Sequence, residues 1–125
     1  MASDADILLI EDEPNIAEAV RFILSRDGWR LAHWAEGGKA LARIAELRPR
    51  LIILDVMLPV LSGLEILAAL RADPELAHIP VLMLTARGVT GRTGIAPDTA
   101  DRLLSKPFDN DELRRVVVDM LGPPG

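Results

Sequence analysis

The sequence predicts an α/β domain in which helices cover both faces of a parallel sheet of five strands. Short apolar runs of strand length alternate along the chain with segments of helical periodicity. Two of these runs, ILLI and LIIL, are apolar at every position, which is typical of strands buried on both faces. Because strands that are separated by helices are usually parallel, this alternation indicates a parallel sheet between two layers of helices.

The first half of the chain is expected to hold three strands and two helices. A strand at 6–10 is followed by Pro14, which suits the first turn of a helix, and Gly28 can cap the end of that helix. A strand at 30–35, a second helix after two glycines, and a strand at 51–55 come next. The positions that follow helical spacing are Ile16, Val20, Ile23, Leu24, Leu41, Ile44 and Ala45.

The second half is expected to add two strands and two well-marked helices, with an irregular helix between the two strands. The Ser-x-x-Glu pair at 62–65 matches a capping box and predicts a helix start, and Asp-Pro at 73–74 ends that helix. Strands are expected at 81–85 and around 103–104, and Asp109 can cap a last helix. The positions expected to face inward in these helices are Leu64, Leu67, Ala68, Leu113, Val116, Val117 and Met120.

Composition limits the classes of function. A length of 125 residues suits one domain, with a core at 6–121 and the Gly-Pro-Pro-Gly at 122–125 as a tail or the start of a linker. The net charge of −5 argues against general affinity for nucleic acid. With no cysteine, a short acidic N-terminal segment and no apolar run long enough to span a bilayer, we expect a cytoplasmic protein.

Polar residues stand where four of the predicted strands end. Glu11 and Asp12 follow the first strand, Asp55 closes the third, Thr85 closes the fourth, and Lys106 follows the fifth. Ligands of parallel sheets bind at the edge where these strand ends meet. Three carboxylates with one ammonium leave a charge that Mg²⁺ would balance, and oxygen ligands favour such a hard cation. This group suits phosphoryl transfer to an aspartate.

Four motifs in order, LLIEDEP, LIILDVMLPVLSG, VLMLTA and SKPF, resemble the receiver domain of two-component response regulators. The resemblance runs from about Asp6 to Leu121 and is closest to regulators of the chemotaxis type. It implies a flavodoxin-like, three-layer (βα)5 fold with strand order 2-1-3-4-5. It also places Pro59 and Gly63 in the loop after the phosphorylation site.

The same resemblance implies a set of metal ligands. Asp12 and Asp55 would bind Mg²⁺ directly, together with the backbone carbonyl of Met57, and Glu11 would act through a bound water. Aspartate is commoner than glutamate at the position of Glu11, so one extra methylene separates this chain from the usual pattern.

The resemblance further implies the phosphoryl chemistry. Asp55 would accept the group from a sensor histidine kinase or a histidine phosphotransfer protein, Thr85 would donate a hydrogen bond to it, and Lys106 would pair with it. The bond from Lys106 to Pro107 is expected to be cis. The protein would be a switch that catalyses its own phosphorylation and slow dephosphorylation, and not an enzyme that turns over small molecules.

Two departures affect the surface that relatives use for partners. The segment 86–104 holds three glycines and Pro97, which predicts a fourth helix that is short, displaced or mobile. Leu103 stands where relatives carry a switch aromatic, so coupling from phosphate to surface is expected to differ. The face made by the fourth helix, fifth strand and fifth helix is a candidate for homodimer contact.

Three other functions are alternatives to this one. A flavin-binding protein would need a phosphate cradle after the first strand, and the acids there would repel phosphate. A phosphatase with an aspartyl nucleophile would carry a DxDx motif after that strand, which this chain lacks. A degenerate receiver that acts only as a protein-docking module stays open. His33 and His78 are expected to be surface or packing residues rather than ligands.

Overall fold

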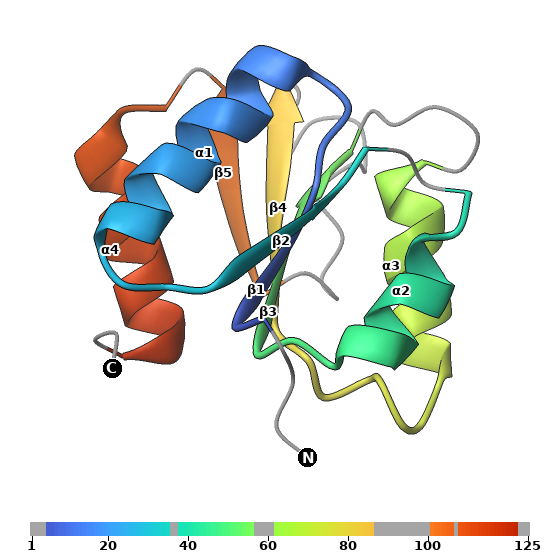
Figure 1. Cartoon of the computed structure of the whole chain (residues 1–125). Coiled ribbons are helices and arrows are strands. Elements are labelled where there is room, and N and C mark those ends of the chain that lie inside the picture. Colours follow the sequence, from blue (N-terminus) through green and yellow to red (C-terminus); the bar gives the residue numbers. More distant parts are fainter. Residues whose placement is uncertain (1–4, 36–37, 57–61, 87–100, 107, 123–125) are drawn as a thin grey trace.

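A single parallel sheet organises the chain (Figure 1). The computed structural model describes residues 5–35, 38–56, 62–86, 101–106 and 108–122. Its sheet has five parallel strands in the order β2-β1-β3-β4-β5, so the predicted architecture and strand order are confirmed. The strands are β1 (Ile7–Ile10), β2 (Leu31–Trp34), β3 (Leu51–Asp55), β4 (Val81–Ala86) and β5 (Arg102–Lys106).

Helices form a layer on each face of the sheet. The described helices are α1 (Pro14–Arg26), α2 (Ala40–Leu47), α3 (Gly63–Ala72) and α4 (Asn110–Leu121). Figure 1 shows α1 and α4 on one face and α2 and α3 on the other. Within the described ranges, no helix has the length and apolar character needed to cross a membrane. The irregular fourth helix predicted from the glycines and Pro97 would fall at 87–100, outside the described residues.

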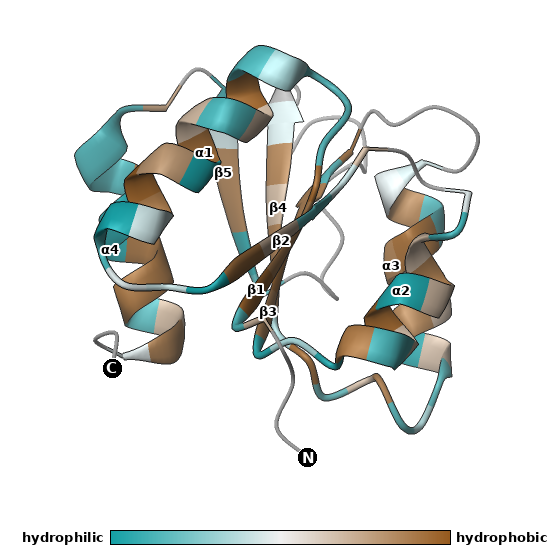
Figure 2. Cartoon of the chain, viewed as in Figure 1, coloured by the Kyte–Doolittle hydropathy of each residue, from teal (hydrophilic) through white to brown (hydrophobic). Residues whose placement is uncertain are grey.

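The core is divided into two apolar layers by the sheet. Along β1, Ile7 and Leu9 join the cluster beneath α1 and α4, whereas Leu8 and Ile10 join the cluster beneath α2 and α3. The apolar sides of the helices turn toward the sheet in Figure 2. Each large side chain buried in this way contributes about 1.5–3 kcal/mol to folding. The two layers hold the central strands firmly, and polar groups are left to the edges where the strands end.

The predicted helix ends are confirmed. Pro14 opens α1, and Gly28 follows its end with a positive φ of 103°. Ser62 Oγ accepts a hydrogen bond from the Glu65 amide at 3.2 Å, and Glu65 Oε1 accepts one from the Ser62 amide at 3.1 Å. Asp109 Oδ1 accepts from the Glu112 amide at 2.7 Å at the start of α4. These caps fix where three helices begin or end.

Two positions that follow helical spacing are exposed, and one of them, Ala68, was expected to face inward. Ala45 of α2 and Ala68 of α3 lie on the solvent side. In α3, the side chains of Ile66 and Leu70 are fully buried, and that of Ala68 is not. A small rotation of a helix about its axis changes which of two neighbouring rows of side chains faces the sheet. Packing against the sheet, and not the apolar pattern of the helix alone, therefore decided which stripe was buried.

Candidate functional site

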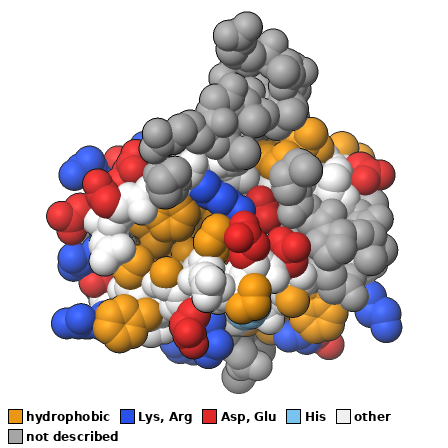
Figure 3. All heavy atoms as spheres, turned by 90° about the horizontal axis from the view of Figure 1, so that it is seen from above, with side chains coloured by type: hydrophobic (Ala, Val, Ile, Leu, Met, Phe, Trp, Pro, Cys, Tyr) orange, Lys and Arg blue, Asp and Glu red, His pale blue; other side chains and the backbone are white. Residues whose placement is uncertain are grey.

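The polar residues at the strand ends meet at one edge of the sheet. Asp55 is the last residue of β3 and lies opposite Leu84, while Thr85 lies opposite Ser105 in the next pair of strands. Asp55 and Thr85 are buried, with 2% and 1% of their surface exposed. Figure 3 looks down on this edge and shows acidic side chains gathered beside a basic one. The parallel register thus brings together groups that are far apart in the sequence.

Three carboxylates form the centre of the site. One oxygen from each of Glu11, Asp12 and Asp55 lies within 4.8 Å of the others. Glu11 is completely buried, whereas Asp12 is exposed. Carboxylates this close together repel one another, and burial removes the water that would otherwise screen them. The cluster is therefore stable only with positive charge beside it.

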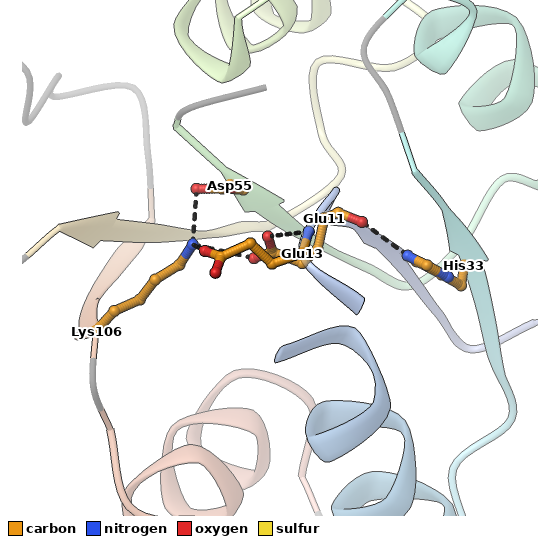
Figure 4. A network of polar contacts seen from close by, with 5 residues as sticks. All are labelled: Glu11, Glu13, His33, Asp55 and Lys106. Atoms are coloured by element: carbon orange, nitrogen blue, oxygen red, sulfur yellow. Dashed lines mark hydrogen bonds and ion pairs between the residues drawn. The ribbon is translucent and has the colours of Figure 1, made fainter. Parts of the chain in front are cut away.

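Lys106 supplies part of that charge. Its Nζ lies 3.2 Å from Glu11 Oε1, 3.2 Å from Asp55 Oδ1 and 3.5 Å from Glu13 Oε1. Figure 4 shows these side chains converging on the ammonium. Burial alone would lower the pKa of Lys106, but the charges of Asp55 and Glu11 outweigh it and raise that pKa above its ordinary value. Lys106 is therefore a permanent cation that is shared among three acids.

The Glu11 carboxylate is incompletely satisfied. Its Oε2 accepts a hydrogen bond from the Glu13 amide at 3.0 Å. Its Oε1 has only the Lys106 ion pair among the described residues, and that contact is not aligned as a hydrogen bond. Burial raises the pKa of Glu11 to about 7, and the charge of Asp55 adds to this, although the Glu13 amide and Lys106 act in the opposite direction. One buried oxygen thus lacks a strong donor.

These residues fit a hard divalent cation. All the donors are carboxylate oxygens, and the orphaned oxygen of Glu11 belongs to the same group. In the structure Glu13 also belongs to this charged group, whereas the charge balance expected from the sequence counted only three carboxylates. Four carboxylates and one ammonium make −3, so that bound Mg²⁺ would leave −1 instead of zero. The Met57 carbonyl and the bond from Lys106 to Pro107 lie outside the described residues.

A close backbone contact sets the position of Asp55. The amide of Gly63, at the start of α3, donates to the carbonyl oxygen of Val56 at 2.9 Å. A Cβ at position 63 would overlap the carbonyl oxygen of Asp55. Only glycine therefore lets α3 begin directly against the end of β3, which gives a physical reason for Gly63 in the motif.

Two contacts at the site were missed from the sequence. His33 Nε2 donates to the carbonyl oxygen of Glu11 at 2.8 Å, a contact with the site that the sequence did not assign. His78 is exposed, as expected. The side chain of Glu13 contacts Lys106, a role that the sequence did not assign. The run of three acids pointed to Glu13, but nothing local pointed to the contact of His33.

Leu103 packs, partly buried, against the α2–α3 layer.

Curated relatives of this chain are response regulators. Response regulator Rre1 of Synechocystis sp. is 37% identical over 123 residues, which are 97% of this chain and 53% of that protein. DNA-binding response regulator MtrA of Mycolicibacterium smegmatis is 37% identical over 108 residues, which are 86% of this chain and 46% of that protein. The chain therefore spans about half the length of the curated relatives it matches.

Solved structures and a family model agree with this. The signal receiver domain of a histidine kinase from Syntrophus aciditrophicus superposes with a TM-score of 0.86 and 31% identity, covering 94% of this chain and 89% of that one. The receiver domain of a sensor histidine kinase from Pseudomonas aeruginosa, with magnesium coordinated in its active-site cleft, gives 0.86 and 30%, covering 96% and 99%. The model of the response regulator receiver domain matches residues 7–118. With its fold, strand order and acidic edge, the chain belongs to the receiver-domain family of two-component response regulators.

Proposed function

We propose that Asp55 is the phosphoryl acceptor of this receiver domain and that Mg²⁺ is its cofactor. The observation that carries the proposal is the surroundings of one carboxylate. Asp55 lies within 4.8 Å of ligand atoms of Glu11 and Asp12. Its Oδ1 lies 3.2 Å from the ammonium of Lys106. Glu11 shares the burial and both kinds of neighbour but follows β1, whereas Asp55 is itself the last residue of β3.

The transfer exchanges one bond to phosphorus for another. A carboxylate oxygen of Asp55 attacks the phosphorus of a phosphohistidine, the bond from phosphorus to the imidazole nitrogen breaks, and that nitrogen leaves with the electron pair. An acyl phosphate remains on Asp55. The Lys106 ammonium pairs with a phosphoryl oxygen, and the hydroxyl of Thr85 donates a hydrogen bond to another.

Glu11, Asp12 and Asp55, with the carbonyl of Met57, are the residues that would hold the metal. Mg²⁺ bound there supplies positive charge that offsets the phosphoryl oxygens. The buried Glu11 contributes through a bound water in this proposal, and its carbonyl is held by His33. Without a cation the acids repel both one another and an incoming phosphate.

The wider role follows from this chemistry. A sensor histidine kinase or histidine phosphotransfer protein is the donor, and the domain acts as a switch in the cytoplasm.

Residues 6–121 form the domain core, and 122–125 form a tail or linker. A contact surface for a second copy would use β5 and α4, together with residues outside the described ranges. Output to DNA, which the names of several relatives indicate for those proteins, would need residues beyond this acidic domain.

Mass spectrometry tests the proposal directly. The protein is incubated with acetyl phosphate, with and without Mg²⁺, beside Asp55→Asn and a matched change at the opposite edge of the sheet, Asp101→Asn. We expect a Mg²⁺-dependent phosphoryl adduct in the native protein and in Asp101→Asn, and none in Asp55→Asn. If folded native protein gives no adduct with this donor or with a histidine kinase, the docking-module function is favoured instead.

A further inference from the structure

We propose that Glu13 selects phosphoryl donors by their charge. This proposal rests on the proposed function. The Glu13 carboxylate competes with the incoming phosphoryl group for Lys106. It thereby disfavours small dianionic donors relative to donors of lower negative charge. Glu13 is therefore a positioning residue that acts through Lys106 and through its own field. It belongs neither to the metal ligands nor to the groups that touch the phosphoryl group.

The first observation is the contact between Glu13 and Lys106. Lys106 Nζ donates to Glu13 Oε1 at 3.5 Å, while its other acid neighbours lie at 3.2 Å. Acceptance of a phosphoryl group requires the ammonium to turn toward a new set of oxygens. Each acid that already holds the ammonium opposes that movement. Glu13 is the one of the three that the transfer does not otherwise need.

The second observation is the charge of the site. Glu11, Asp12, Glu13 and Asp55 carry four negative charges if all are ionised, and Lys106 carries one positive charge. Mg²⁺ leaves the group with a net −1, and the whole chain is also negative, at −5. An anion that approaches this edge is repelled, and the repulsion grows with the charge of the anion. Removal of the Glu13 charge would bring the metal-loaded site to neutrality.

The third observation separates the side chain of Glu13 from its backbone. The side chain is 60% exposed at the rim of the site, where the chain turns from β1 into α1. Its backbone amide donates to Glu11 Oε2 and does not depend on the side chain. Glu13→Gln therefore removes the charge while the amide that supports Glu11 stays in place. The substitution is a clean test of charge.

The experiment compares two small donors of different charge. Near pH 7 acetyl phosphate carries two negative charges, whereas phosphoramidate carries one net negative charge. Initial rates of Asp55 phosphorylation are measured at saturating Mg²⁺ for native protein, Glu13→Gln and Glu18→Gln. Glu18 lies exposed on α1, the helix that begins directly after Glu13, so its substitution changes net charge equally without the Lys106 contact. Calorimetry with Mg²⁺ alone gives the metal affinity of each variant.

We expect Glu13→Gln to react about three- to tenfold faster with acetyl phosphate, with a smaller gain for phosphoramidate and a loss of the difference at high salt. Its Mg²⁺ affinity should fall a few-fold, because one negative charge is gone. A merely structural role would move the rate and the metal affinity in the same direction. Glu18→Gln should match the native protein in both measurements.

The outcomes distinguish this inference from the function on which it rests. If no variant gains an adduct, the proposed function fails. If Asp55 is phosphorylated but Glu13→Gln reacts at the native rate, or gains equally with both donors, the selectivity of Glu13 is refuted and the function stands.

Discussion

The acids at the two ends of the sheet have different numbers of hydrogen-bond and ion-pair partners. At the amino end, Asp6 accepts hydrogen bonds from the Arg30 amide at 3.0 Å and from its guanidinium at 3.4 Å. Asp101 likewise accepts from the Val81 amide at 2.8 Å and from the Arg71 guanidinium at 2.9 Å. At the carboxyl end, three acids share the ammonium of Lys106 among the described residues, and a fourth, Asp12, lies beside two of them.

The pKa values show what this difference means. Burial alone would raise the pKa of Asp6, but the hydrogen bonds and charge of Arg30 outweigh it and lower that pKa. Burial prevails at Glu11 and raises its pKa to about 7. The amino end is thus completed by donors from the chain itself. At the carboxyl end the described residues hold more acids than cations, and this imbalance marks the edge that needs a ligand from outside.

The largest effect is expected from blocking the close contact that shapes the carboxyl end. Gly63→Ala places a Cβ against the carbonyl of Asp55, so the end of β3 or the start of α3 must move. We expect a loss of about 2–3 kcal/mol in the free energy of unfolding, measured with urea. Gly122→Ala is the control, because a Cβ there meets no atom within 4 Å and only its φ of 83° is unfavourable. Equal losses in the two variants would contradict the steric argument.

Mg²⁺ should stabilise one end of the sheet selectively. At a concentration of one hundred times its Kd, a ligand that binds only the folded state adds about 2.7 kcal/mol. We expect thermal unfolding of the native protein and of Asp6→Asn to shift upward with Mg²⁺, and that of Asp12→Asn to shift much less. A similar shift in Asp12→Asn would place the cation elsewhere.

Metal-free stability should depend on pH through Glu11. Because its folded pKa of about 7 exceeds the ordinary value of 4.5, the folded state holds this proton more tightly. Its contribution is fully present below pH 4.5 and is lost as pH rises through 7, at a cost of about 1–3 kcal/mol. The pH dependence from Asp6 runs in the opposite direction. Its lowered folded pKa stabilises the fold above the ordinary pKa of 3.8, and this stabilisation is lost as pH falls below that value.

Urea unfolding in chelator at several pH values between 4.5 and 8 measures this slope. Glu11→Gln should flatten the fall and make the metal-free protein more stable than the native one at pH 8. The same variant should gain less from Mg²⁺. An unchanged slope in Glu11→Gln would assign the pH dependence to another group.

The smallest effects are expected at the amino end. Asp101→Asn weakens the hydrogen bonds to the Arg71 guanidinium and the Val81 amide, and we expect a loss of about 1 kcal/mol without any change in Mg²⁺ affinity. Glu75→Gln removes an exposed ion pair with Arg48 and should change stability by less than about 0.5 kcal/mol. A larger effect of Glu75→Gln would show that exposed pairs also support this end.

The sequence by itself determined the elements and the edge where the chemistry lies. Apolar runs, Pro14, the capping box at 62–65 and the cap at Asp109 are local signals, and each acted within a few residues. Once parallel strands were predicted, the position of Asp55 at a strand end followed directly from its place after LIIL.

Tertiary structure alone decided how side chains from different elements meet. The rotation of α3 buried Ile66 in place of Ala68, the register of β2 against β1 brought His33 to the Glu11 carbonyl, and the fifth strand carried Lys106 to Glu13. These contacts join residues many positions apart, so no local pattern encodes them. Their geometry depends on how the two apolar layers pack against the sheet, which only the folded chain establishes.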